Sequence, residues 1–177
     1  VHQFRFAWRN AKKTGIEMML LPEEKEAFYG NYAVLHTTQF TDGITIDIGG
    51  GSTEVTFYEN KELKQYHSFP FGVVTLKQMF FDGKDHNDPK AIKKMQEFVK
   101  EQFKSIKWLS KKQVPIGAMG GSARSIANVH QRQINYRLAG VHGYRMYRND
   151  LQRTLDLFQS LSIPQLQNLD GLSRDRS

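Results

Sequence analysis

The sequence contains no cysteine. This absence excludes a disulfide-stabilised fold and thiol catalysis, and it fits a reducing compartment, so we expect a cytoplasmic protein. No apolar run approaches the ~18 residues that a membrane span needs, and the N-terminal residues lack a signal-peptide layout. We therefore expect no membrane partner. The chain starts without methionine and stops abruptly, which leads us to expect a piece of a longer protein.

What the chain does contain is enough apolar material for a core. Of its 177 residues, 39% are hydrophobic and 12 are phenylalanine. We expect a single domain across residues 1–177. The formal net charge of +7 favours anionic partners such as nucleic acid, phosphate esters or a membrane surface. Much of this charge lies in residues 88–112, whose apolar residues keep helical spacing, so we interpret those lysines as the solvated face of a helix.

Helical and strand patterns alternate along the chain, with an antiparallel meander at residues 43–71. In its first strand, Ile44, Ile46 and Ile48 point to one face and Thr45 and Asp47 to the other. The alternation predicts an α/β fold with a mixed sheet flanked by helices. The predicted helices cover 3–13, 21–36, 73–81, 88–112, 122–131 and 149–162, and the predicted strands cover 16–20, 43–48, 54–59, 62–71, 114–119 and 142–147.

The stretch "DIGGGSTEV" at residues 47–55 is the most informative motif. A Walker loop needs Gly-Lys-Ser/Thr opening a helix, and a dinucleotide fingerprint also needs a helix after its glycines. Here a second strand pattern follows, so the glycines form the tip of a hairpin. Glycines allow a positive φ and leave backbone N–H groups uncovered, which predicts a nest for an anion.

Acidic residues flank these glycines on both strands. Asp47 ends the first strand and Glu54 starts the second, so the hairpin brings both carboxylates near its tip. Two carboxylates beside a phosphate would repel it unless a hard cation such as Mg²⁺ lies between them. The plainer interpretation is an ordinary hairpin turn with solvated acids at its base.

Two further glycine loops precede predicted helices. Gly72 follows one strand, and Gly120, Gly121 and Ser122 follow another. Each loop places free N–H groups and a helix N-terminus at the end of a strand, where an anion can bind. Either loop alone is explained equally well as a helix cap. Three such loops in one small sheet favour an anion site.

Glu26 is a third acid of interest. It shares a helical face with Gly30 and Ala33. Small residues at these positions either clear space beside the carboxylate or let the helix pack closely on the sheet. An exposed glutamate in an acidic first helical turn is an equal alternative.

Five motifs in this order resemble a known family. "PEEKEA", "IDIGGGSTE", "FPFGVV", "GGSAR" and "GLSRDR" are similar to those of the exopolyphosphatase/guanosine pentaphosphate phosphohydrolase (Ppx/GppA) family, over nearly the whole chain. "DIGGGSTE" is quite specific within the actin-like superfamily to which that family belongs. The resemblance implies an actin-like (ribonuclease H-like) lobe.

The same resemblance implies Mg²⁺-dependent hydrolysis of the terminal phosphate of inorganic polyphosphate, or of the 5′ phosphate of pppGpp. Family members begin with another lobe that carries Asp-x-Gly-Ser-Asn-Ser, and nothing here matches that loop. We therefore expect the second lobe alone, nearly inactive by itself, with the first lobe as its partner in cis. Polyphosphate or guanosine penta/tetraphosphate would be the ligand, and homodimerisation of the full-length form is left open.

The resemblance also assigns roles to residues. Glu26 and Glu54 match catalytic acids, and Asp47 and Glu54 match metal-side carboxylates. The predicted phosphate-binding residues are Gly49, Gly50, Gly51, Ser52, Thr53, Gly72 and Val73, and the predicted nucleoside-side or substrate-binding residues are Gly120, Gly121, Ser122 and Arg124.

Some residues depart from the family pattern, and two other classes of function stay open. Thr75 stands where many members have arginine, and Ser122 where threonine is common, which leaves the substrate preference undecided. A non-catalytic regulator that binds (p)ppGpp is one alternative, although Glu26 and Glu54 argue against it. A nucleic-acid-binding module needs aromatics among basic residues. Only residues 132–148 offer this, and we interpret their tyrosines as packing residues, so nucleic acid is not an expected partner.

Overall fold

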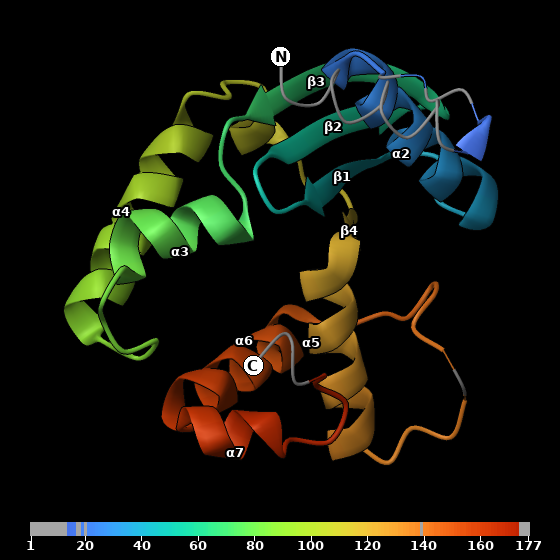
Figure 1. Ribbon diagram of the computed structural model, residues 1–177. Coiled ribbons are helices and arrows are strands. Elements are labelled where there is room, and N and C mark those ends of the chain that lie inside the picture. The colour runs from blue at the N-terminus through green and yellow to red at the C-terminus, as the bar shows by residue number, and fades with distance from the viewer. Residues whose placement is uncertain (1–13, 17–18, 20, 139, 174–177) are drawn as a thin grey trace.

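The computed structural model describes residues 14–16, 19, 21–138 and 140–173 (Figure 1). The helix predicted at 3–13 lies outside these residues. The elements are α2 (Glu23–Thr37), β1 (Gly43–Ile48), β2 (Thr53–Glu59), β3 (Glu62–Phe69), α3 (Val73–Phe81), α4 (Pro89–Lys104), a 3-10 turn (Leu109–Lys111), β4 (Ile116–Met119), α5 (Gly120–Gln133), α6 (Arg148–Ser160) and α7 (Ile163–Gln167).

The four strands form one mixed sheet in the order β3-β2-β1-β4. β1, β2 and β3 form the predicted antiparallel meander, and β4 lies parallel to β1. A parallel neighbour needs a long crossover, which α3 and α4 supply between the meander and β4. The prediction of an α/β fold with a mixed sheet is confirmed.

One face of the sheet carries the apolar core. Ile44, Val55, Phe57 and Phe69 on the strands are buried together with Phe71 and Ile106. Three residues of α4, Phe98, Val99 and Phe103, pack against this cluster. The lysines of α4 therefore lie on its outer side, as the helical spacing predicted. Phe69 stacks on both Phe71 and Phe103, with ring centroids 5.0 Å apart in each pair.

The other face of the sheet is polar and lies under α2. Thr45 and Thr56 are both buried there, and their hydroxyl groups share a hydrogen bond. A Cβ added to Gly117 of β4 would lie 3.5 Å from Cγ1 of Val34, and one added to Gly30 would lie 3.3 Å from Cε of Met119. The distance at Gly117 is an ordinary van der Waals contact and the one at Gly30 is slightly tighter, so α2 lies directly on this face.

The helices after the sheet gather at one end of it. Figure 1 shows α5 leaving β4 and running away from the sheet, with α6 and α7 beside it. Thr154 of α6 is fully buried. Gly171, with φ of +91°, lies so close to α5 that an added Cβ would be 2.8 Å from the carbonyl carbon of Asn128. The chain after α7 is therefore packed against α5.

Several local predictions are wrong. Ile16 and Met19 fall in the predicted buried strand at 16–20, yet they are 66% and 80% exposed and belong to no strand. Residues 142–147 also form no strand, and α7 was not predicted. Among the described helices, none combines the length and hydropathy that crossing a bilayer requires.

Asp88 gives a pH-dependent test of the start of α4. Its Oδ1 accepts hydrogen bonds from the N–H groups of Lys90 and Ala91, at 2.8 and 2.9 Å. The bond from Ala91 is the main cause that lowers the pKa of Asp88 below its ordinary value of 3.8. A lowered folded-state pKa stabilises the fold above the unfolded-state pKa, and this contribution is lost as the pH falls through the folded value.

Asp88→Ala is therefore expected to lower the melting temperature at neutral pH, and the difference from the wild type should shrink in acid. Circular-dichroism melts at both pH values measure it. Asp88→Asn is the matched control, because asparagine also caps a helix. A melting difference that stays the same in acid would contradict the electrostatic part of the explanation.

Candidate functional site

A row of polar residues crosses the sheet where β1 ends and β2 begins. Asp47 of β1 is the Cα partner of Glu54 of β2, which in turn is the partner of Ser68 of β3. Cross-strand partners share a face, so all three lie on the polar face. The predicted hairpin with both acids near its glycine tip is confirmed.

Glu54 is a buried carboxylate, with 8% of its surface exposed. Ser68 Oγ donates a hydrogen bond to Glu54 Oε1 at 3.3 Å. Burying an ionised carboxylate is costly unless donors surround it. Ser68 was missed in the sequence, although the alternation of residues 62–69 places it on the polar face.

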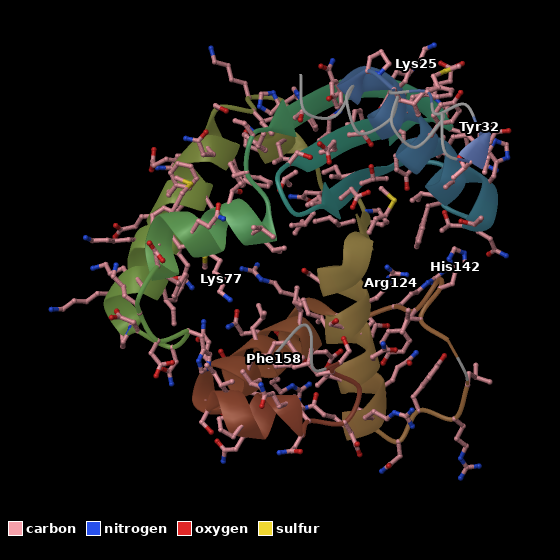
Figure 2. All side chains as sticks on the ribbon, in the orientation of Figure 1. Lys25, Tyr32, Lys77, Arg124, His142 and Phe158 are labelled. Atoms are coloured by element: carbon pink, nitrogen blue, oxygen red, sulfur yellow. The ribbon has the colours of Figure 1, made fainter. Side chains whose placement is uncertain are left out.

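Asp47 is half-buried beside Glu54. Burial raises the pKa of Asp47, and the guanidinium group of Arg124 partly opposes this shift. Figure 2 labels Arg124 on the part of α5 that lies nearest the sheet. A positive charge at this point offsets part of the negative charge that the two acids bring to the site.

The glycine turn at residues 49–51 differs in detail from the prediction. None of its three glycines has φ in the left-handed region, so the turn does not use the positive φ that glycine allows. The turn closes through a hydrogen bond from the N–H of Gly49 to the carbonyl of Ser52, at 3.0 Å. Gly50 and Gly51 are exposed, and their N–H groups have no acceptor in the described part of the chain. These two N–H groups remain available to an anion.

The N–H groups at the start of α3 are hydrogen-bonded to the glycine turn itself. The N–H groups of Val73 and Val74 donate to the carbonyls of Gly49 and Gly50, at 3.0 and 2.9 Å. The N–H of Gly72 donates to Thr75 Oγ1 at 2.7 Å. The expectation of free N–H groups at this helix start is therefore wrong, because the turn packs too closely on α3. A role for Gly72 and Val73 in binding phosphate stays a prediction.

Thr53 makes a contact that the sequence did not predict. It is 2% exposed, and its hydroxyl donates to the carbonyl of Phe71 at 2.7 Å. The hydroxyl of Thr53 is thus engaged in another bond, and its role in binding phosphate stays a prediction. Thr53 instead ties β2 to the segment that leads into α3. Ser52, the other predicted residue of the turn, is half-buried beside it.

The start of α5 lies against Asp47. Gly120 has φ of +87°, and a Cβ there would be 2.8 Å from the carbonyl oxygen of Ile48 and 3.0 Å from Asp47 Oδ1. Gly120, Gly121 and Ser122 are the first residues of the helix, and no side chain caps this end. The predicted loop at residues 120–122 is thus brought to the carboxylate row, with a helix N-terminus that favours negative charge.

Glu26 lies on α2, the helix that covers the polar face of the sheet. Val34 lies over Gly117, and Gly30, one turn earlier, lies over Met119 at the end of β4. α2 also contacts β1, β2 and β3, so it lies across the polar face of the sheet, and the next turn toward its N-terminus is about 5.4 Å further along its axis. Glu26 belongs to this turn. Its side chain lies outside the described ones, so its catalytic role stays a prediction.

The donor set of the site is made of oxygens. In the part of the chain that the structure describes, no three His, Cys, Asp or Glu residues gather where they could hold a metal. The pair of Asp47 and Glu54 remains, on adjacent strands and on one face. Mg²⁺ is commonly held by one or two carboxylates, with water and substrate phosphate as further ligands. The two acids fit that arrangement.

A comparison with protein families gives a match that spans nearly the whole chain. The model of the Ppx/GppA phosphatase family matches residues 3–177. A curated relative from Fusobacterium nucleatum, a bifunctional 3-dehydroquinate synthase/phosphatase, is 24% identical over 169 residues, which are 92% of this chain and 26% of that protein.

Solved structures show the same fold. A Ppx/GppA family member from Aquifex aeolicus superposes with a TM-score of 0.78 at 21% identity, over 98% of this chain and 56% of the other. An exopolyphosphatase from Cytophaga hutchinsonii gives a TM-score of 0.71 at 17% identity, over 96% of this chain and 56% of the other. The chain thus spans little more than half the length of these structures, and about a quarter of the curated relative.

Proposed function

Because the chain belongs to the Ppx/GppA phosphatase family, we propose that it is the second lobe of a phosphatase that removes the terminal phosphate of inorganic polyphosphate. Polyphosphate is favoured because one structural relative is described as an exopolyphosphatase and another as exopolyphosphatase-like. The activity is proposed for the full-length protein, since this chain spans 56% of those relatives.

The observation that carries the proposal is the cross-strand pairing of Asp47 with Glu54 beneath the glycine turn. Two acids beside the uncovered N–H groups of Gly50 and Gly51 combine a carboxylate pair with an anion nest. The uncapped start of α5 adjoins Asp47 on its other side. A site of this composition suits a substrate that is highly anionic and reacts with water.

Asp47 and Glu54 are the residues that would hold Mg²⁺. When bound there, the cation would neutralise charge on the phosphate oxygens. Without it, the two carboxylates would oppose a polyanionic substrate, and among the described residues Arg124 is the cation that acts on Asp47. We therefore expect phosphate release to require a divalent cation.

The chain's own residues would supply the remaining parts of the reaction. Phosphoryl transfer to water depends mainly on positioning and on neutralising charge. The N–H groups of Gly50 and Gly51 would hold oxygens of the terminal phosphate. Glu26 and Glu54 would orient the attacking water and accept its proton. As the water oxygen forms a bond to the terminal phosphorus, the bond between that phosphorus and the bridging oxygen breaks. The bridging oxygen leaves with the shortened chain.

Orthophosphate release tests the proposal directly. The full-length protein with Mg²⁺ is expected to release orthophosphate from polyphosphate, faster than from pppGpp, and the 177-residue chain alone little or none. Faster release from pppGpp would replace the substrate and keep the reaction. Tight binding of (p)ppGpp without any release would favour the non-catalytic regulator instead.

A further inference from the structure

We propose that Ser68 positions the carboxylate of Glu54 for the reaction. This inference rests on the proposed function, because it takes Glu54 as one of the acids that handle the attacking water. Ser68 itself would touch neither substrate nor water. It would act by fixing the direction in which the Glu54 carboxylate presents its second oxygen.

The geometry places Ser68 directly beside the acid. The two residues are Cα partners in the antiparallel pair of β2 and β3, and Ser68 Oγ lies 3.3 Å from Glu54 Oε1. Ser68 is half-buried and Glu54 is buried. The hydroxyl thus donates to the carboxylate where water has little access.

The backbone of Ser68 is held in place by its neighbour. Phe69, the next residue, is 2% exposed and stacks on Phe71 and Phe103 in the core on the opposite face. Since consecutive residues of a strand point to opposite faces, this anchoring directs Ser68 to the polar face. The donor therefore lies next to a residue that is anchored in the core.

A glutamate needs such a donor to hold one orientation. Its last side-chain torsion has broad minima, so the carboxylate plane is not fixed by staggering alone. A hydrogen bond to Oε1 restricts that rotation and leaves Oε2 in a defined direction. In a reaction that depends on placing a water molecule, a misplacement of about 1 Å can cost on the order of a hundredfold in rate.

Thr45 and Thr56 offer a comparison on the same face of the sheet. Their hydroxyl groups bond to each other, one pleat away from the carboxylate row. Thr45→Val removes a buried hydroxyl from the sheet without touching Glu54. It is therefore a matched control for the stability effect of losing a hydroxyl at Ser68.

Steady-state kinetics of the full-length protein on polyphosphate tests the proposal. Ser68→Ala is expected to lower kcat by about tenfold, the usual effect of one hydrogen bond to a charged group, with KM changed less than about twofold. Ser68→Thr keeps the hydroxyl and should restore most of kcat. Thr45→Val should lower the melting temperature and leave kcat within about twofold of the wild type.

The outcomes separate this proposal from the proposed function. If Ser68→Ala keeps the wild-type kcat while Glu54→Gln loses it, Ser68 does not position the acid, although Glu54 still acts. The positioning role is also overturned if Ser68→Thr is as slow as Ser68→Ala, or if Thr45→Val slows catalysis equally. If Glu54→Gln keeps the wild-type kcat, the catalytic role of Glu54 in the proposed function fails, and the role of Ser68 fails with it.

Discussion

Replacing Glu54 by glutamine in the full-length protein is expected to lower kcat for phosphate release by about 10²–10⁴-fold. Glutamine keeps the shape of the side chain and can still accept a hydrogen bond from Ser68, but it cannot take a proton from water or carry negative charge. Glu54 is buried beside Asp47, whereas the other acid of β2, Glu59, lies at the far end of the strand and cannot replace it. Orthophosphate release at saturating polyphosphate measures the effect.

Glu59 provides the matched control for this substitution. It lies at the other end of the same strand and is exposed to solvent. Glu59→Gln removes the same charge from β2 and is expected to leave kcat within about twofold. Glu26→Gln is expected to resemble Glu54→Gln, since Glu26 lies on the helix that covers the face on which Glu54 lies. Wild-type turnover in both the Glu26 and Glu54 variants would remove the catalytic assignment.

The hairpin and its acids could be predicted because they depend on local patterns. The alternation of Ile44, Ile46 and Ile48 fixes which way Asp47 points, and a strand pattern directly after the glycines fixes the hairpin. Together these features place Asp47 opposite Glu54. The same alternation gives the sheet an apolar face that needs a helix against it. The helical spacing of Phe103 and the other apolar residues of α4 identified that helix correctly.

Contacts between distant segments could not be predicted in the same way. The glycine turn uses its carbonyls on α3, and Thr53 uses its hydroxyl on Phe71. Both bonds depend on where α3 comes to lie after the strands have paired. Sequence patterns identify N–H groups that are free at a helix start, but they do not show which neighbouring segment will supply the acceptors for them.

Residues 132–148 illustrate the same limit. Tyr144 packs edge-on against Tyr136 with ring centroids 5.0 Å apart, and its hydroxyl bonds to His130 Nδ1 at 2.8 Å. The interpretation of these tyrosines as packing residues is correct for Tyr144. It is wrong for Tyr147, which is 82% exposed before α6. Alternation does not separate Tyr144 from Tyr147, because residues 142–147 form no strand.

Replacing Gly72 by alanine is expected to destabilise the fold by about 1–3 kcal/mol, the usual range for forcing extra atoms into a packed site. The backbone of Gly72 is extended, with φ of −144°, so alanine has no difficulty with the conformation itself. The obstacle is steric, because the new Cβ would lie 2.3 Å from the carbonyl oxygen of Gly49 and 2.7 Å from the carbonyl carbon of Gly50. These are backbone atoms, which cannot rotate away as a side chain could.

The glycine turn must therefore separate from α3 in this variant, and the hydrogen bonds from Val73 and Val74 to the turn are lost with the contact. For a protein of this size, the expected fall in melting temperature is about 2–10 °C. Gly51→Ala is the matched control, since a Cβ there meets no atom within 4 Å and should change stability by less than about 0.5 kcal/mol. Equal melting temperatures for the Gly72 and Gly51 variants would mean that the turn moves away from α3 at little cost. In that case the N–H groups at the start of α3 could be freed for an anion, as the sequence alone predicted.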